Sequence, residues 1–155
     1  MAALATDAEF TPEALEPGRF RIDSAGWAEK TDPKGVRYLE NPEGDAWELQ
    51  DGPFAGEQFF TYESAVRETA KAGKRMPTKD EWEVVTEAGT FVPTFAGSWN
   101  WNRGRYYDQG TNASYWSSSP NGGVAYNAHF LSNGVSITTN SLRANGFSVL
   151  CVRNS

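Results

Sequence analysis

Residues 74–89, KRMPTKDEWEVVTEAG, contain both a start signal and a stop signal for a helix. Thr78 and Glu81 have the T-x-x-E spacing of a capping box, in which each side chain accepts a hydrogen bond from the other residue's backbone N–H. The acids that follow Thr78 lie in the first turn, where the helix dipole favours them. Gly89 follows the last apolar position and is typical of a helix C-terminus. We therefore predict a helix between Thr78 and Gly89 whose acids have a structural rather than a catalytic role.

The residues before this helix indicate a second helix and several short strands. Thr61 is a good N-cap and Gly73 a good C-terminal stop, which predicts a helix over 61–72. Apolar and polar residues alternate in three segments before it, as they do in strands with one buried face. Strands are therefore predicted over 18–24, 35–40 and 46–50.

The residues after Gly89 are rich in aromatic side chains, Gly and Asn. Residues 95–120 are expected to form irregular loops between very short strands, and residues 140–146 an irregular segment. The remaining segments combine β-branched and aromatic residues between turn signals. Strands are predicted over 124–131, 135–139 and 147–153.

The 155-residue chain has the size of one domain, and its charge is unevenly distributed. The first 17 residues, rich in Ala and acids, are expected to form an N-terminal arm, and residues 18–155 a single domain. All 20 acidic residues lie before Ser117, whereas residues 117–155 also lack Lys, Gln, Met and Trp. The net charge of −6 argues against a nucleic-acid partner. We also expect no direct membrane insertion and no classical signal peptide.

Three motifs together resemble those of a known family. RMPTKDEWEVV at 75–85 is similar to the R-L-P-T-x-x-E-W-E motif of formylglycine-generating enzymes and their non-enzymatic relatives. YWSSSP at 115–120 and GFSVLCVR at 146–153 resemble the closing Y-W-S-S-S … G-x-x-V-R-C-V-R pattern of related domains. From about residue 60 onward, the chain thus resembles the variable proteins of diversity-generating retroelements. One departure is Leu150, where members of that family commonly carry Arg.

The resemblance implies a C-type-lectin-like α+β fold, with two helices, a small twisted antiparallel sheet and long irregular loops. It also implies a mechanism for the missing residue types. Such retroelements randomise adenines near the end of a gene, which turns Asn codons into many others but never into Lys, Glu, Gln, Met or Trp codons. Asp is reachable by this route, so its absence stays unexplained. An alternative is that a twisted antiparallel sheet with Asn/Gly turns is itself poor in charge.

The resemblance places a variable ligand-binding region at about residues 117–153, on outward positions of the last strands and loops. Because strand side chains alternate, one face of residues 124–131 can pack on the core while the other presents its side chains. Small polar and aromatic side chains also dominate antibody loops. Val135, Ile137, Val149 and Val152 are expected in the core, whereas Trp99, Trp101, Tyr106 and Tyr107 suit either core or rim. The expected ligand-binding residues are Asn121, Gly122, Val124, Asn127, His129, Leu131, Ser136, Thr138, Asn140, Leu142, Asn145 and Phe147.

The sequence argues against the catalytic and metal-binding uses of related folds. Formylglycine-generating enzymes hold copper with two cysteines, whereas Cys151 is the only cysteine here. His129, the only histidine, has no acid nearby in sequence to orient it. The E-P-N or Q-P-D and W-N-D motifs of calcium-dependent lectins are absent. We expect no catalytic residues, no metal site and no cofactor.

The resulting hypothesis is a non-catalytic, receptor-binding protein with a hypervariable surface, exposed on a virion or a cell. Its expected partner is a variable protein or cell-surface ligand, and the sequence is compatible with an oligomer. Two alternatives stay open. One is a fixed, non-diversified paralogous surface domain of the same fold, and the other is a structural assembly component of a virion.

Overall fold

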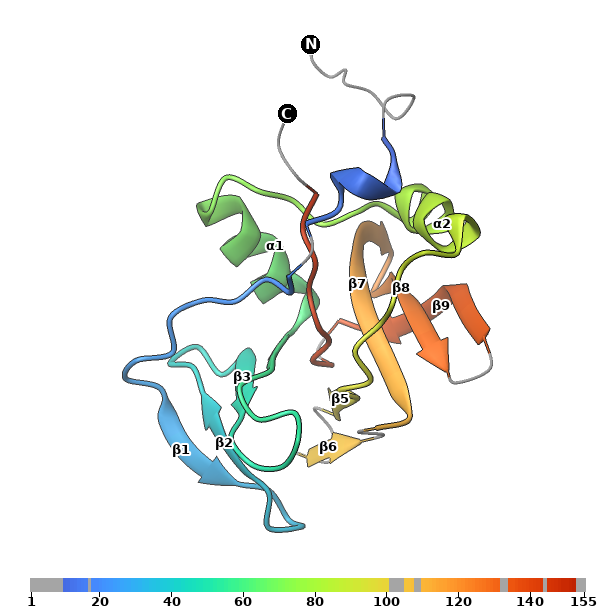
Figure 1. The fold of residues 1–155 in the computed structure, drawn as a ribbon. Helices are drawn as coiled ribbons and strands as arrows, with labels where there is room; N and C mark the ends of the chain where they lie inside the picture. The colour runs from blue at the N-terminus through green and yellow to red at the C-terminus, as the bar shows by residue number, and fades with distance from the viewer. Residues whose placement is uncertain are drawn as a thin grey trace.

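The structure, a computed structural model, describes residues 10–16, 18–100, 105–107, 110–131, 134–143 and 145–152, with side chains for all but 105–107 and 137–142. It shows a mixed α+β fold in which two helices accompany antiparallel sheets (Figure 1). The expected α+β class and the two helices are therefore confirmed.

The first half of the chain forms a four-stranded antiparallel sheet of order β1-β2-β3-β4. β3 is buried along its whole length, whereas β1 is exposed throughout and forms the outer edge. Two of the three predicted strands are confirmed, but residues 18–24 form no strand. Their backbone is tied elsewhere, because Phe20 N–H donates to Val149 O and Ile22 N–H donates to Gln58 Oε1. The strands are β1 (Ala28–Thr31), β2 (Arg37–Glu40), β3 (Ala46–Leu49) and β4 (Gln58–Phe60).

The two helices are α1 (Tyr62–Lys71) and α2 (Lys79–Ala88), which confirms both helix predictions. Thr61 and Thr78 cap them, and the capping box between Thr78 and Glu81 is complete. Gly89 ends α2 in the left-handed conformation, with a φ of 72°. A residue with a Cβ is strained at that φ, which explains why the stop signal is a glycine.

The start of α2 is fixed by an ion pair whose carboxylate is buried. Glu81 is 3% exposed and accepts hydrogen bonds from both terminal nitrogens of Arg75, at 2.7 and 2.9 Å. Burial alone would raise the pKa of Glu81, but the hydrogen bonds from Arg75 and from the Thr78 N–H outweigh it and lower that pKa. The carboxylate predicted to be structural is thus held ionised inside the fold.

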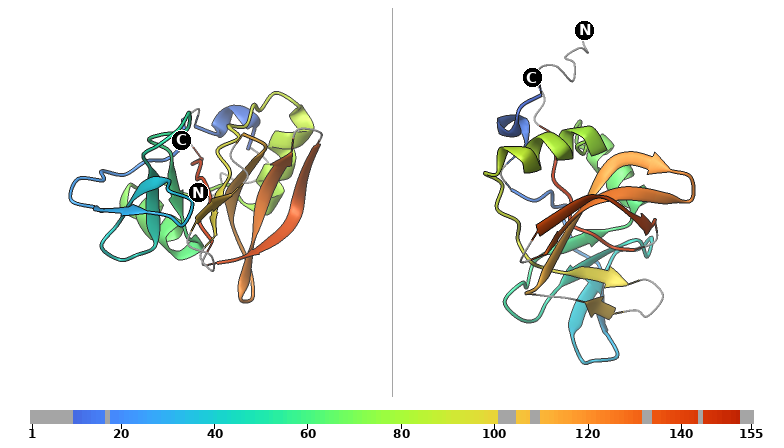
Figure 2. Two further views of the ribbon diagram at one scale, coloured as in Figure 1. Left: turned by 90° about the horizontal axis from the view of Figure 1, so that it is seen from below. Right: turned by 90° about the vertical axis from the view of Figure 1, so that its right-hand side faces the viewer.

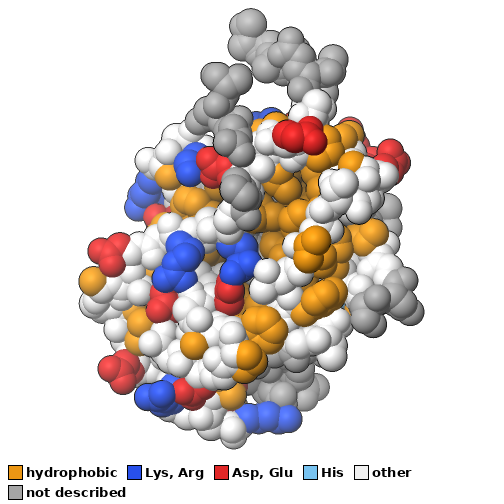
Figure 3. Space-filling model, in the orientation of Figure 1, with side chains coloured by type: hydrophobic (Ala, Val, Ile, Leu, Met, Phe, Trp, Pro, Cys, Tyr) orange, Lys and Arg blue, Asp and Glu red, His pale blue; other side chains and the backbone are white. Residues whose placement is uncertain are grey.

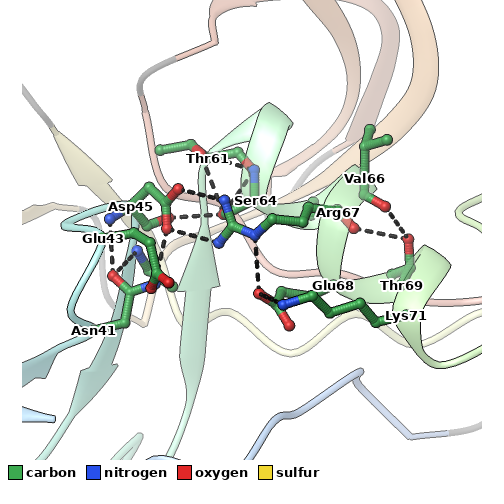
Figure 4. A network of polar contacts seen from close by, with 12 residues as sticks. Asn41, Glu43, Asp45, Thr61, Ser64, Val66, Arg67, Glu68, Thr69 and Lys71 are labelled. Atoms are coloured by element: carbon green, nitrogen blue, oxygen red, sulfur yellow. Dashed lines mark hydrogen bonds and ion pairs between the residues drawn. The ribbon is translucent and has the colours of Figure 1, made fainter.

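A second polar network joins α1 to the β2–β3 turn (Figure 4). Arg67 Nη1 and Nη2 donate to the two carboxylate oxygens of Asp45, at 2.8 and 3.0 Å, and Asn41 Nδ2 donates to the same carboxylate at 2.8 Å. Burial would raise the pKa of Asp45, but Arg67 and Asn41 outweigh it and lower that pKa. A bidentate pair of this kind fixes orientation as well as distance. It lies entirely outside the tract that follows Ser117.

The second half of the chain forms two further antiparallel sheets. β5 (Ser98–Asn100) pairs with β6 (Arg105–Tyr107), and β7 (Asn112–Asn121), β8 (Val124–Leu131) and β9 (Gly134–Leu142) pair in that order. The strand prediction for 124–131 is confirmed. The expectation of very short strands within 95–120 holds for β5 and β6, which are three residues long each, but is wrong for β7, which is ten residues long. β9 also extends beyond the predicted 135–139.

Residues 145–152, which we term the closing segment, link these sheets through isolated bridges rather than the single strand predicted for 147–153. Phe147 and Phe60 exchange two backbone hydrogen bonds at 2.9 Å, and Gly146 and Trp99 do the same. Ser148 N–H donates to Ser114 O at 3.0 Å. The closing segment therefore contacts β4, β5 and β7 in turn, and Figure 1 shows it running through the middle of the fold.

The N-terminal residues also join this arrangement. Of the expected arm, residues 10–16 are described, and they include η3 (Pro12–Ala14). Leu15 is 8% exposed and bridges Val152, and Glu16 N–H donates to Cys151 O at 2.8 Å. Packing against the domain thus begins before residue 18. The two ends of the described chain lie side by side in the views of Figures 1 and 2.

The core divides into three aromatic-rich clusters. One surrounds Trp116 between α1 and the closing segment, and one surrounds Trp82 between α2 and the last sheet. The third surrounds Trp47 and Trp99 on the first sheet. Within the described residues, neither helix is long and apolar enough to cross a membrane.

Candidate ligand-binding surface

The sheet β7–β8–β9 carries most of the predicted ligand-binding residues, and its register decides where they lie. Ser114 is opposite His129, which is opposite Ser136, and Asn112 is opposite Leu131. Directly paired residues point to the same face of a sheet. The strands also contain irregularities near Trp116 and after Asn127, so the alternation is not continuous.

The predicted residues divide into two groups at opposite ends of β8. Seven steps of about 3.3 Å separate Val124 from Leu131, so the ends lie roughly 23 Å apart. One group surrounds the β7–β8 turn, and the other surrounds the end of the β8–β9 hairpin. The exposed members are Asn121, Gly122, Leu131 and Ser136, and the half-buried ones are Val124, His129 and Asn145. Thr138, Asn140 and Leu142 belong to β9, but their side chains lie outside the described part.

Two predicted ligand-binding residues are buried, and their assignment to the surface is wrong. Phe147 is 5% exposed because its ring lies 4.4 Å from the Trp116 ring, centroid to centroid. Asn127 is 1% exposed and stands opposite Trp116 in the β7–β8 register. Alternation correctly placed Asn127 and His129 on one face. It could not show that the Trp116 cluster covers that face at Asn127 and leaves it open towards Leu131.

The expected core residues are only partly confirmed. Val149 and Val152 are buried, but Val135 is 45% exposed at the start of β9, so its core assignment is wrong. The side chain of Ile137 lies outside the described part. Trp99 belongs to the core, where its ring stacks on Trp47 at 5.1 Å. The side chains of Trp101, Tyr106 and Tyr107 are not among those described.

His129 makes a hydrogen bond across the strands to Ser114. Its Nδ1 lies 2.8 Å from Ser114 Oγ, and Ser114 is 4% exposed. Among the described residues, no carboxylate hydrogen-bonds to His129. A serine activated for nucleophilic attack would need an accessible hydroxyl and an oriented base. This pair instead gives the open end of the sheet a half-buried imidazole, a group suited to polar contacts.

An apolar groove beside this end of the sheet was not predicted. It has a volume of about 310 Å³, and its walls come from α2, from residues 91–95 and from the β8–β9 hairpin. The sequence FVPTF at 91–95 precedes or begins the region expected to be irregular, and no element was predicted for residues 91–94. Its signal was the presence of three large apolar side chains in a segment without strand or helix periodicity.

A second cleft, of about 350 Å³, lies on β1 and β2 and is polar. It is lined by Lys30 and Arg37, but these are paired with Glu40 and Asp51. Within the described part of the chain, no three or more His, Cys, Asp or Glu side chains lie together as metal ligands would. Burial raises the pKa of the Cys151 thiol to about 11, which keeps it protonated at neutral pH.

These features define the class as an α+β domain with antiparallel sheets and an uncharged, partly apolar surface at the end of the last sheet. Comparisons with models of protein families, with curated proteins and with solved structures gave no match. The particular function is therefore argued from the residues themselves.

Proposed function

We propose that this chain is a non-catalytic ligand-binding protein that recognises its target with a surface diversified by a retroelement. The observation that carries the proposal is the separation of charge from this surface. After Ser117, Arg143 is the only charged side chain among those described, and it is paired with Glu63. The other ion pairs among described residues join residues before Ser117. Changes in the tract would therefore leave nearly all of them in place.

A C-type-lectin-like fold is part of the proposal, and the contacts between the three motifs support it. Trp82 of the first motif donates from Nε1 to the backbone oxygen of Trp116 in the second, at 3.3 Å. Trp116 N–H donates to Ser148 O in the third motif, at 3.2 Å. Val152 N–H of the third motif donates to Arg75 O of the first motif, at 2.8 Å. Motifs that are far apart in sequence thus form one connected framework.

The framework leaves room for variation at the exposed positions. Leu131 and Ser136 lie at the open end of the sheet, and Asn121 lies at the opposite end in the β7–β8 turn. Substitutions at exposed positions away from caps and ion pairs usually change stability by no more than about 0.5 kcal/mol. Gly122 differs, because its φ of 62° disfavours residues with a Cβ. We therefore expect the diversified positions to include the first three and to spare Gly122.

Recognition without catalysis suits the chemistry of this surface. It offers hydroxyl, amide and imidazole groups for hydrogen bonds beside aliphatic and aromatic area, which is the combination that adaptable binding loops use. The half-buried His129 is expected to contact a ligand, and the buried Ser114 to hold its ring in place, without transforming the ligand. Attachment of a virion or a cell to its target is the role that such a surface serves in this proposal.

The test is to sequence the DNA downstream of this gene for a near-copy of the segment that encodes 117–153, beside a reverse-transcriptase gene. A copy that differs almost only at its adenines supports diversification. The differing codons should include those of Leu131, His129 or Ser136 and should exclude those of the buried Phe147 and Val149. Absence of a near-copy, together with an identical tract in sibling isolates, would replace this proposal with the fixed paralogous domain.

A further inference from the structure

Two adjoining grooves lie beside α2, and the first of them shares Leu131 with the proposed binding surface. The first is the 310 Å³ groove described above, and the second has a volume of about 300 Å³ and lies between α2 and the N-terminal residues. Val85 and Phe91 line both, so the grooves share a wall. Figure 3 shows apolar side chains gathered over α2 and the linker that follows it. We term the two together the α2 groove.

Apolar side chains along the α2 groove are unusually exposed. Val92 is 82% exposed, Val135 45% and Leu131 43%, and these three account for most of the large exposed apolar residues described. None of the ten residues that line the first groove is charged. Contiguous apolar area of this kind on a folded protein commonly marks a binding site. Single exposed apolar residues, such as Val84 on the outer side of α2, need no such explanation.

Two described carboxylates next to residues that line the groove have no ion-pair partner among the described residues. Glu13 is exposed next to Pro12, which lines the second groove, and Glu87 is exposed next to Thr86, which lines the first. Neither carboxylate forms an ion pair with a described residue. The neighbouring bases cannot balance them, because Lys74 is paired with Glu16 and Lys79 with Glu83. The rim of the groove thus carries a surplus of negative charge.

We propose that the α2 groove is a docking site for an extended apolar segment of a partner protein that carries basic residues at its flanks. The apolar side chains of such a segment would bury Val92, Leu131 and Val135. Its basic groups would meet Glu13 and Glu87 at the rim, where charge complementarity favours association and selects the partner. The groove walls from α2 and 91–95 lie outside the tract proposed to vary, whereas Leu131 and Val135 lie inside it, so substitutions at these two positions should change the affinity of docking.

The experiment titrates the full chain, isotope-labelled for NMR, with the end-blocked peptide Arg-Leu-Val-Leu-Arg. We expect saturable shifts of the backbone amides of residues 91–95 and of the β8–β9 hairpin. The peptide Glu-Leu-Val-Leu-Glu should bind at least about fivefold more weakly. Glu13→Gln combined with Glu87→Gln should weaken binding of the Arg peptide by about twofold to fivefold, whereas Glu29→Gln on β1 should leave it unchanged.

Two valine variants provide the matched comparison. Val92→Asp should weaken binding of the Arg peptide by about tenfold. Val84→Asp makes the same change at an exposed valine outside the groove and should leave binding unchanged. Both side chains are exposed, so both variants should melt close to the unsubstituted chain. Equal binding of the Arg peptide to both variants, or equal affinity for the two peptides, would overturn the proposal. So would a dimer of the unsubstituted chain that Val92→Asp dissociates, because the occupant would then be a second copy.

Discussion

Replacing Phe147 with alanine tests the boundary between framework and binding surface most directly. Phe147 was expected to contact ligand, yet its ring packs on Trp116 and is 5% exposed. A buried phenylalanine removes roughly 150–200 Å² from water, which at about 25 cal/mol per Å² is worth about 4–5 kcal/mol. Measured losses for Phe→Ala in cores are similar, at about 3–5 kcal/mol. For a domain of this length, that corresponds to a fall in Tm of roughly 6–20 °C.

Leu131→Ala is the matched control, because it also shortens a large apolar side chain of the predicted site. Leu131 is 43% exposed, so its truncation should cost only about 1 kcal/mol or less. The assay is thermal unfolding followed by circular dichroism, with urea unfolding as a check on the slope. If both variants lowered Tm by the same amount, the assignment of Phe147 to the framework would be refuted. The diversified surface would then extend into what we regard as core.

Three further predictions follow from particular contacts. Glu81→Gln should flatten the acid side of the stability profile between about pH 7 and pH 3 in urea unfolding. A carboxylate with a lowered folded pKa stabilises the fold above its ordinary pKa and loses that contribution as the pH falls. Gly146→Ala should cost about 1–3 kcal/mol in the same assay, since a Cβ there would come within 2.9 Å of Trp99 Cβ, whereas Gly123→Ala meets open space and should cost far less. The Cys151 thiol should resist an aromatic disulfide reagent at about pH 8 in the folded protein and react fully in urea; rapid reaction of the folded chain would contradict its burial.

The helices were predictable because their signals are local. A capping box and a terminal glycine act within a few residues of one another, so Thr78, Glu81 and Gly89 define α2 without any tertiary information. The strands over 35–40 and 46–50 were likewise recovered from alternation. Residues 18–24 alternate equally well, but their backbone partners lie in the closing segment and on Gln58. Nothing local distinguishes such a segment from a strand.

The candidate site was less predictable because exposure depends on what covers each face. Alternation grouped Asn127 with Leu131, but the covering cluster around Trp116 comes from segments far away in sequence. Val135 has an apolar, β-branched side chain typical of the core, but it lies at the edge of the core and is 45% exposed. The apolar groove is a product of three separate segments, so its existence depended on packing that no single stretch encodes.

The way in which the closing segment is held is compatible with the variable tract that we propose. Gly146, Phe147, Ser148 and Val152 bind neighbouring strands through backbone N–H and C=O groups, which every residue except proline provides in full. Such bonds do not depend on the side chains between them. Side-chain identity matters where a ring or branch fills the core, as at Phe147 and Val149, and at Gly146, where a Cβ would meet Trp99. A mutagenic process that altered the exposed positions would therefore change what the surface binds while leaving the connections of the fold intact.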